Sequence, residues 1–368
     1  MLIGKILNDI KNAGRTIDED DAPKNRGNPR LGVLKELPGV WSNAGPLQGH
    51  AWNLIALPFG PPGKLGDFRL LLNQANETLD FDLVDLGVPN RGANHDDQHL
   101  AALRYLQALD QVAAADAVSD LTLPGGVKSN ATDDTNDTPK GNTLPGPGVP
   151  PKTAVGIHRE PGLFLHLAND VGPPPNFGQP GPDVARLANI PHGDAVLAMG
   201  FGGDAAPTPG GPNLADPALK ALFDPFPIGL GTTDLNNLYF APYKFFHDKP
   251  FKNLFDPTDP LALLIPAVAT AFPGSSIIET TTFTVDSTVR GGIQNIPFVI
   301  GQADATRVTA TFWIERVRMS SGKERFILQY AQRVLLEFFP RADKQPGLIQ
   351  WPHISINTMI RGGDDDDD

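Results

Sequence analysis

Alternation of two sets of side chains with a period of two is the feature that most restricts the folds open to this chain. In segment 307–314 one set is Val308, Ala310, Phe312 and Ile314, and the other is Arg307, Thr309, Thr311 and Trp313. Because successive side chains of a strand point to opposite faces, this pattern predicts a strand. Other strand-like segments are 77–83, 163–167, 277–285, 326–339 and 354–358. Many strands without a strand–helix rhythm predict an antiparallel sheet, closed or sandwiched.

Helical spacing of apolar residues occurs in two places, at Asp96–Val112 and near the N-terminus. The N-terminal apolar stretch is too short to span a membrane and charged residues interrupt it, so we expect a short docking helix. The alternative is a helix lying on a membrane surface. No secretory signal is apparent, and we therefore expect a cytoplasmic location without a membrane span.

Glycine and proline are abundant, with 38 and 37 residues among 368. They gather in 122–152, 171–182 and 201–217, which are predicted to be long loops. Residues 218–274 mix a short helix near 218–223 with aromatic stretches broken by proline. Those aromatic side chains must pack somewhere, so we expect an ordered cap against the main body.

Composition excludes several kinds of site. The chain has no cysteine, which rules out disulfides, iron–sulfur clusters, thiolate haem ligands and covalent c-type haem. The net charge of −12 argues against a nucleic-acid groove, which needs a basic surface. The motifs of P-loop nucleotide binding, dinucleotide binding, zinc proteases and serine hydrolases are also absent.

Histidine is the remaining residue type that suggests a site. His95 and His99 are four residues apart, so a helix would place both on one face for a metal. The interpretation that we favour is a first helical turn in which both imidazoles are solvated. His158 and His166 would share a face of an uninterrupted strand, but Pro161 and Gly162 lie between them.

Two further histidines lie at the edges of predicted strands. His192 falls in a predicted turn, where a hydrogen-bonded structural role is the ordinary expectation. His353 follows Trp351-Pro352 and opens the last strand, on a face shared with Ser355 and Asn357. A histidine in that position can ligate a metal or haem iron through one ring nitrogen.

The order of short motifs along the chain resembles that of the nitrobindin-like haem-binding β-barrel family. The motifs are Leu37-Pro-Gly-Val-Trp41, Glu77-x-Leu-x-Phe81, Tyr105-x-Gln107, His158-x-Glu160-x-Gly162, His192-Gly193 leading to Gly200, the strands 309–317 and 330–338, and the last strand opened by His353. The resemblance covers most of 37–110, 153–200 and 277–360.

The resemblance implies a mainly β fold, an antiparallel up-and-down β-barrel of about ten strands with long loop insertions and a few short helices. Together with the residue patterns, it predicts three regions: an N-terminal helix and linker at 1–36, a single barrel domain at 37–360 with insertions at 122–152 and 201–276, and an acidic disordered tail at 361–368.

The same resemblance implies a non-covalent b-type haem with His353 as its axial ligand. His158 and Glu160 match the family motif and are candidate pocket or framework groups. The expected pocket lining is Trp41, Trp52, Phe338 and Trp351. Family members bind nitric oxide and isomerise peroxynitrite, so a small diatomic ligand, isomerase chemistry or weak peroxidase activity is expected, and whether the chain is an enzyme stays open.

Two other functions remain open from the residues. A lipocalin-like barrel of this size can carry an apolar small molecule without chemistry. Alternatively, the aromatic segment Phe240–Phe255 is a contact patch of an interaction or structural protein. The sequence does not indicate an oligomeric state.

Overall fold

A computed structural model describes residues 25–43, 45–58, 68–91, 97–119, 127–129, 155–169, 181–232 and 234–362. The predicted N-terminal helix, almost all of the insertion 122–152 and the acidic tail from residue 363 lie outside these ranges. No helix in the described ranges is long and apolar enough to cross a membrane.

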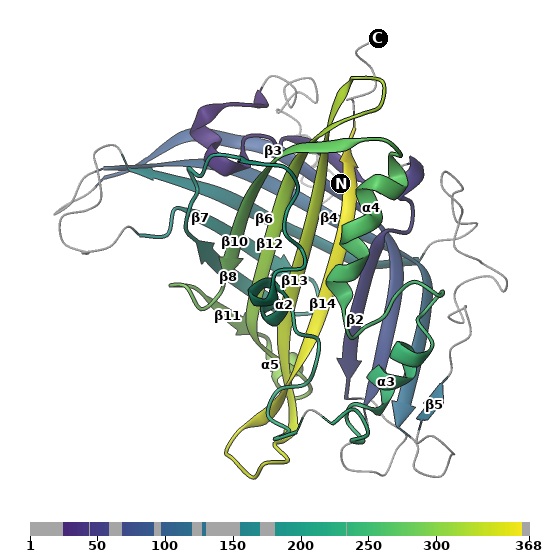
Figure 1. Ribbon diagram of the computed structural model, residues 1–368. Helices are drawn as coiled ribbons and strands as arrows, with labels where there is room; N and C mark the ends of the chain where they lie inside the picture. Colours follow the sequence, from purple (N-terminus) through teal and green to yellow (C-terminus); the bar gives the residue numbers. More distant parts are fainter. Residues whose placement is uncertain are drawn as a thin grey trace, which may run out of the picture.

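Ten antiparallel strands form a ring, each paired with the strand before it and the last paired with the first (Figure 1). They are β2 (Ala51–Leu57), β3 (Arg69–Asn90), β4 (Gln98–Ser119), β6 (Val155–Asn169), β7 (Val184–Ile190), β8 (Asp194–Gly200), β10 (Ser276–Asp286), β12 (Asp304–Arg318), β13 (Glu324–Pro340) and β14 (Leu348–Arg361). The predicted up-and-down barrel is therefore confirmed.

Shorter elements extend or cover this ring. The strands are β1 (Gly39–Ser42), β5 (Val127–Ser129), β9 (Thr208–Pro209) and β11 (Gly292–Asn295). The helices are η3 (Pro29–Leu34), η4 (Gly45–Leu47), α2 (Pro217–Leu222), α3 (Ala241–Asp248), η5 (Pro260–Leu263), α4 (Leu264–Ala271) and α5 (Pro297–Ile300). Helix α2 confirms the helix predicted near 218–223, and Asp216 caps it by accepting from the backbone amides of Ala218 and Leu219.

The prediction of a helix at Asp96–Val112 is wrong, because its residues from Gln98 onward belong to the long strand β4. Strand β4 pairs with β3 on one side and β6 on the other. Leu103, Tyr105 and Leu109 are buried, whereas Leu106 is 50% exposed on the opposite face. Because Leu106 is apolar although it faces outward, the apolar residues of this segment have the spacing expected of a helix. Pairing along both edges of the strand outweighs the helical propensity of its alanines and leucines.

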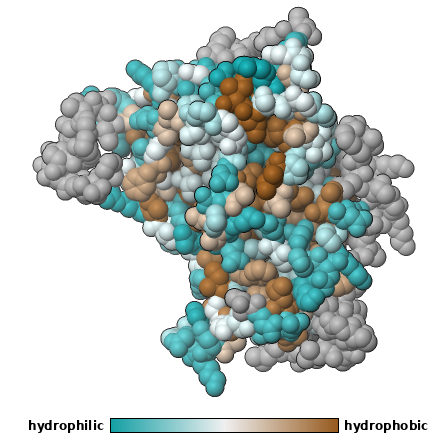
Figure 2. Space-filling model, viewed as in Figure 1, coloured by the Kyte–Doolittle hydropathy of each residue, from teal (hydrophilic) through white to brown (hydrophobic). Residues whose placement is uncertain are grey.

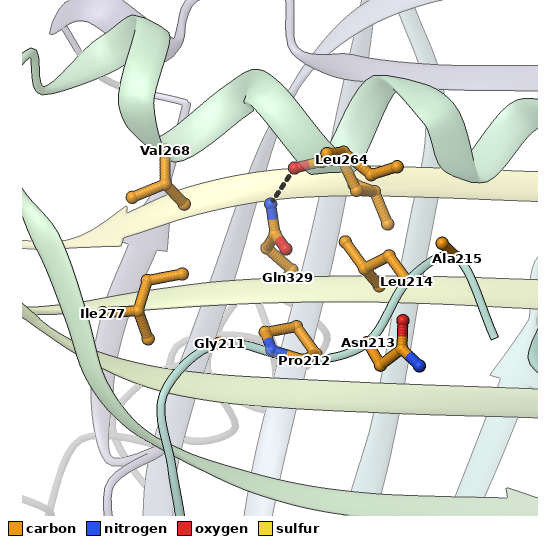
Figure 3. Close-up of a pocket in the computed structure, with 10 residues that line it drawn as sticks. Gly211, Pro212, Asn213, Leu214, Ala215, Leu264, Val268, Ile277 and Gln329 are labelled. Atoms are coloured by element: carbon orange, nitrogen blue, oxygen red, sulfur yellow. Dashed lines mark hydrogen bonds between the residues drawn. The ribbon is translucent and has the colours of Figure 1, made fainter.

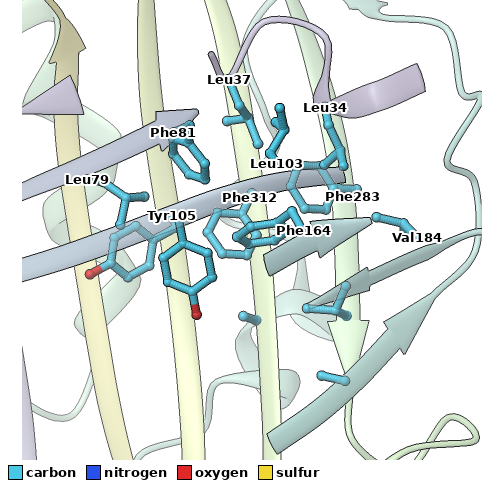
Figure 4. Packing of buried hydrophobic residues seen from close by; sticks show 14 of the residues in the cluster. Leu34, Leu37, Leu79, Phe81, Leu103, Tyr105, Phe164, Val184, Phe283 and Phe312 are labelled. Carbon is cyan, nitrogen blue, oxygen red and sulfur yellow. The ribbon is translucent and has the colours of Figure 1, made fainter. Parts of the chain in front are cut away.

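Aromatic side chains fill the barrel at the end closed by η3 (Figure 4). The rings of Phe283 and Phe312 stack with centroids 5.0 Å apart, and Phe164 packs edge-on against both. The chain of η3 crosses this end through Gly32, whose φ is 54°. A Cβ at Gly32 would lie 2.1 Å from the carbonyl oxygen of Gly203, so this crossing requires glycine.

The insertion 201–276 packs on the outer wall of the barrel (Figure 1). Its buried residues include Phe240, Tyr243, Phe246, Phe251 and Phe255, which form one cluster with outward-facing residues of β2, β3, β13 and β14. The predicted ordered cap is thus present, and it covers the outer wall of the barrel. Since these aromatic side chains are already buried, the segment Phe240–Phe255 is not a free contact patch. Apolar and polar side chains are mixed on the outer side of this cover (Figure 2).

Candidate ligand pocket

A cavity of about 480 Å³ occupies the barrel interior and reaches α5. Helix α5 lies at the end of the barrel away from η3 (Figure 1). The walls of the cavity are mainly apolar, formed by inward-facing side chains of β2, β4, β6, β13 and β14 and by α5. The apolar lining includes Ile55, Leu57, Leu71, Leu109, Ile157, Ile190, Val299, Val334 and Leu336. The polar lining includes Asn53, Asn73, Gln107, His158, Glu160, His192, Asp194, Tyr330, Gln332, His353 and Ser355.

His353 reaches this cavity from β14, where it is paired with Val334 of β13. Its Nε2 atom is buried and has no hydrogen-bond partner among the described residues. Burial, together with the charges that His158 and His192 can carry, lowers the pKa of His353 to about 3. The imidazole is therefore neutral near pH 7, and a neutral imidazole offers a lone pair to a metal.

His158 and His192 lie together at another part of the cavity. His158 Nε2 is 3.1 Å from Glu160 Oε2, and its Nδ1 is 3.5 Å from His192 Nε2. His192 is an exposed residue of the turn between β7 and β8, which confirms the predicted turn. Gly193 makes that turn with a φ of 121°, and a Cβ there would collide with Ile296. Burial and the neighbouring His158 lower the pKa of His192.

Glu160 is the centre of a buried charged cluster that adjoins His158. It accepts hydrogen bonds from the Tyr105 hydroxyl and, at 2.7 Å, from Arg186 Nη2. Burial raises the pKa of Glu160, but the charge of Arg186 and the hydrogen bonds outweigh it and bring the pKa down to about 2. Glu160 is therefore a carboxylate, and the His158 nitrogen facing it must be the N–H donor.

A second buried carboxyl, Glu77, sits beside this cluster. It accepts hydrogen bonds from Tyr330 at 2.6 Å, from Gln107 at 2.6 Å and from Asn357 at 2.7 Å. Burial raises the pKa of Glu77, and these hydrogen bonds offset part of the rise. Tyr330 and Gln107 also line the cavity, so the network fixes the polar part of its wall.

The structure brings together two of the predicted site residues, His158 and His353. Glu160, the candidate pocket or framework group of the same motif as His158, also lines the cavity. Sequence reasoning missed Arg186, whose signal is an arginine at an inward position between Val184 and Ala188. A charge inside an apolar alternation indicates a buried ion pair.

The four predicted aromatic lining residues do not line this cavity. Trp41 packs in the aromatic core toward η3 and donates to the Leu37 carbonyl at 2.7 Å. Trp52, Phe338 and Trp351 belong to the cluster beneath the insertion 201–276, where Phe338 and Trp351 stack with centroids 4.9 Å apart. Trp52 points outward, whereas Trp351 and Phe338 are in phase with the cavity residues His353 and Leu336 and pack beyond the cavity along their strands. Both faces of these strands are buried, so apolar character does not identify the inward face.

Among the described residues, the other histidines considered in the sequence do not line this cavity. His95 is outside the described residues, and His99 is in strand β4, so the helical spacing assumed for a metal pair does not exist. Strand β6 continues through Pro161 and Gly162, which places His166 on the same inward face as His158. His166 is buried near η3, where its Nδ1 lies 2.8 Å from the Arg30 carbonyl oxygen.

A second pocket, of about 200 Å³, lies on the outer wall between residues 211–215 and α4 (Figure 3). Gln329 closes one side by donating to the Leu264 carbonyl at 2.9 Å. No acidic, basic or histidine side chain lines it, so it offers no group for acid–base chemistry.

Comparisons with known proteins leave the family unassigned. No family model matches the sequence, and no curated protein matches it. The crystal structure of Rv2717c from M. tuberculosis is a similar solved structure, with 11% sequence identity over 89% of this chain and 96% of that one. Its TM-score of 0.31 is too low to support a functional argument.

Proposed function

We propose that this protein binds a non-covalent b-type haem in the barrel cavity, with the imidazole of His353 as the axial ligand. The observation that carries the proposal is the buried Nε2 of His353, which lies in a mainly apolar cavity without a partner among the described residues. Haem needs only one protein ligand to its iron, and a histidine is a common one. A bound haem would supply binding of small diatomic ligands and redox chemistry.

The residues around the cavity fit the requirements of such a cofactor. The neutral His353 offers its lone pair, and the apolar lining excludes water from most of the cavity. His158 lies on β6, four strand-to-strand steps from the β14 of His353 in the ring of ten. It therefore faces the cavity from a nearly opposite wall, where its imidazole and Glu160 can hold a proton. We extend the proposal to a nitrobindin-like protein with isomerase or weak peroxidase activity, located in the cytoplasm.

Titration with hemin tests this proposal. The wild-type protein is expected to develop a Soret band that saturates at one equivalent of hemin, and His353→Ala is expected to lose or shift it. His247→Ala is the matched control, because His247 is an exposed residue of α3 outside the cavity. Absence of a Soret band in the wild type, or an identical band in His353→Ala, contradicts the proposal.

A second candidate function is carriage of an apolar small molecule. It is favoured by α5, where Phe298 lines the cavity yet is 70% exposed and Ile300 is 57% exposed. Exposed apolar side chains at a cavity rim are typical of an entry for apolar ligands. This function predicts tight binding of a fluorescent fatty acid that hemin does not displace. Displacement by one equivalent of hemin would favour the haem proposal instead.

A further inference from the structure

The spacing of His158 and His192 differs from that of an ordinary hydrogen bond. Their facing nitrogens, Nδ1 and Nε2, are 3.5 Å apart, and the ring planes are inclined by 40°. Hydrogen bonds from N–H donors are usually about 2.7–3.2 Å long. Two nitrogens that share a tetrahedral metal with bonds of about 2.0–2.1 Å are separated by about 3.4 Å. The observed distance is thus closer to that of two ligands on one ion.

The hydrogen bonding of His158 suits a metal ligand. Its Nε2 donates to the Glu160 carboxylate, which Arg186 holds at 2.7 Å. A neutral imidazole that donates from Nε2 carries its lone pair on Nδ1, the atom that faces His192. Carboxylates commonly orient metal-binding histidines in this way from behind the ring.

A third group in the same cavity points to a cation. Asp194 follows His192 by two residues, is 8% exposed and lines the cavity. Its Oδ1 is buried and has no hydrogen-bond partner among the described residues. A buried carboxylate oxygen without a partner is costly, and a nearby cation would offset that cost directly or through water.

We propose that His158 Nδ1 and His192 Nε2 form a binding site for a divalent transition metal such as Zn²⁺ at the rim of the cavity. Glu160 orients His158, and the unpartnered Asp194 lines the same cavity. In the described part of the chain, no set of three histidine or acidic side chains is already placed around one ion. The remaining coordination positions are therefore open to water or a small ligand. The exposed ring of His192 can turn toward the shared ion.

Calorimetric titration of the full-length, haem-free protein with ZnCl₂ tests this site, with the visible spectrum of added Co²⁺ as a second readout. One equivalent is expected to bind. His158→Ala and His192→Ala are each expected to weaken binding at least about tenfold, and Glu160→Gln by about 10–100-fold, the range for orienting partners. His192 is exposed in a turn, so its variant is expected to fold, and His247→Ala is the control for surface histidines.

Lack of saturable binding at one equivalent, or unchanged affinity in both histidine variants, overturns the proposal. The site does not use His353, so His353→Ala is expected to bind Zn²⁺ as the wild type does. Loss of Zn²⁺ binding in His353→Ala would place the ion at that nitrogen and overturn the assignment. Because the titration contains no hemin, failure of the haem proposal leaves its outcome unaffected.

Discussion

At the scale of single residues, the chemistry of the cavity depends on which polar groups have partners. Glu160 and Glu77 are buried with several hydrogen-bond donors each, whereas His353 Nε2 and Asp194 Oδ1 are buried without a partner among the described residues. His353 and His158 were predicted as site residues because the order of short motifs pointed to them. Arg186 was not, since its partner Glu160 is adjacent only in the folded barrel.

The ion pair of Arg186 and Glu160 is expected to be important for stability because both partners are buried. Arg186→Met leaves an uncompensated carboxylate inside the barrel, and we expect a loss of about 3–5 kcal/mol in the free energy of unfolding. Urea denaturation measures it. The matched control is Arg104→Met, whose ion pair with Asp82 is 52% and 20% exposed and is expected to contribute about 0–1 kcal/mol. Equal losses in the two variants would contradict this prediction.

At the scale of elements, local patterns identify strands but not the face that points inward. The alternation in 307–314 correctly predicts β12. It does not show that Trp313 joins the outer cluster while Phe312 joins the inner one, because both faces are buried. The outward face of Trp52 follows from the same cause, whereas Trp351 and Phe338 share the phase of the lining residues and pack beyond the cavity along their strands. A one-residue difference in phase exchanges lining and outer residues.

The insertion is expected to stabilise the barrel through its buried aromatic residues. Phe246 of α3 is 1% exposed in the outer cluster, and we expect Phe246→Ala to cost about 3–5 kcal/mol in chemical denaturation. Leu254→Ala is the control, since Leu254 is 50% exposed in the same insertion and is expected to have a small effect. A small effect of both substitutions would mean that the cover contributes little to stability.

At the scale of the whole molecule, the ring of strands has one weak seam. Strands β8 and β10 are joined by a single residue pair, Asp286 with Met199. Asp286 accepts hydrogen bonds from Arg307 Nη2 at 2.6 Å and from the Thr309 hydroxyl at 2.7 Å. Burial raises the pKa of Asp286, but hydrogen bonds from Arg307 and Thr288 outweigh it and lower the pKa to about 2.

Acid is expected to weaken the contacts that hold the β10 side of this seam to β12. A carboxyl whose folded-state pKa is lowered from 3.8 to about 2 contributes stability that is present above about pH 4 and is lost as the pH falls toward 2. We expect the contribution to be about 1–2 kcal/mol, allowing for partial solvent screening. Thermal unfolding between pH 6 and pH 2 measures it, and Asp286→Asn should show a weaker pH dependence than the wild type. An unchanged dependence would contradict the assignment.

The outer cover changes how much the interior of the barrel must contribute to stability. In a bare barrel the interior is the main place where apolar side chains can leave water, so a cavity there weakens the fold. Here a large aromatic cluster lies between the insertion and the outer wall. Cohesion therefore does not depend on the interior alone, and the apolar side chains that line the cavity are expected to tolerate substitution better than the buried ion pair of Glu160 and Arg186.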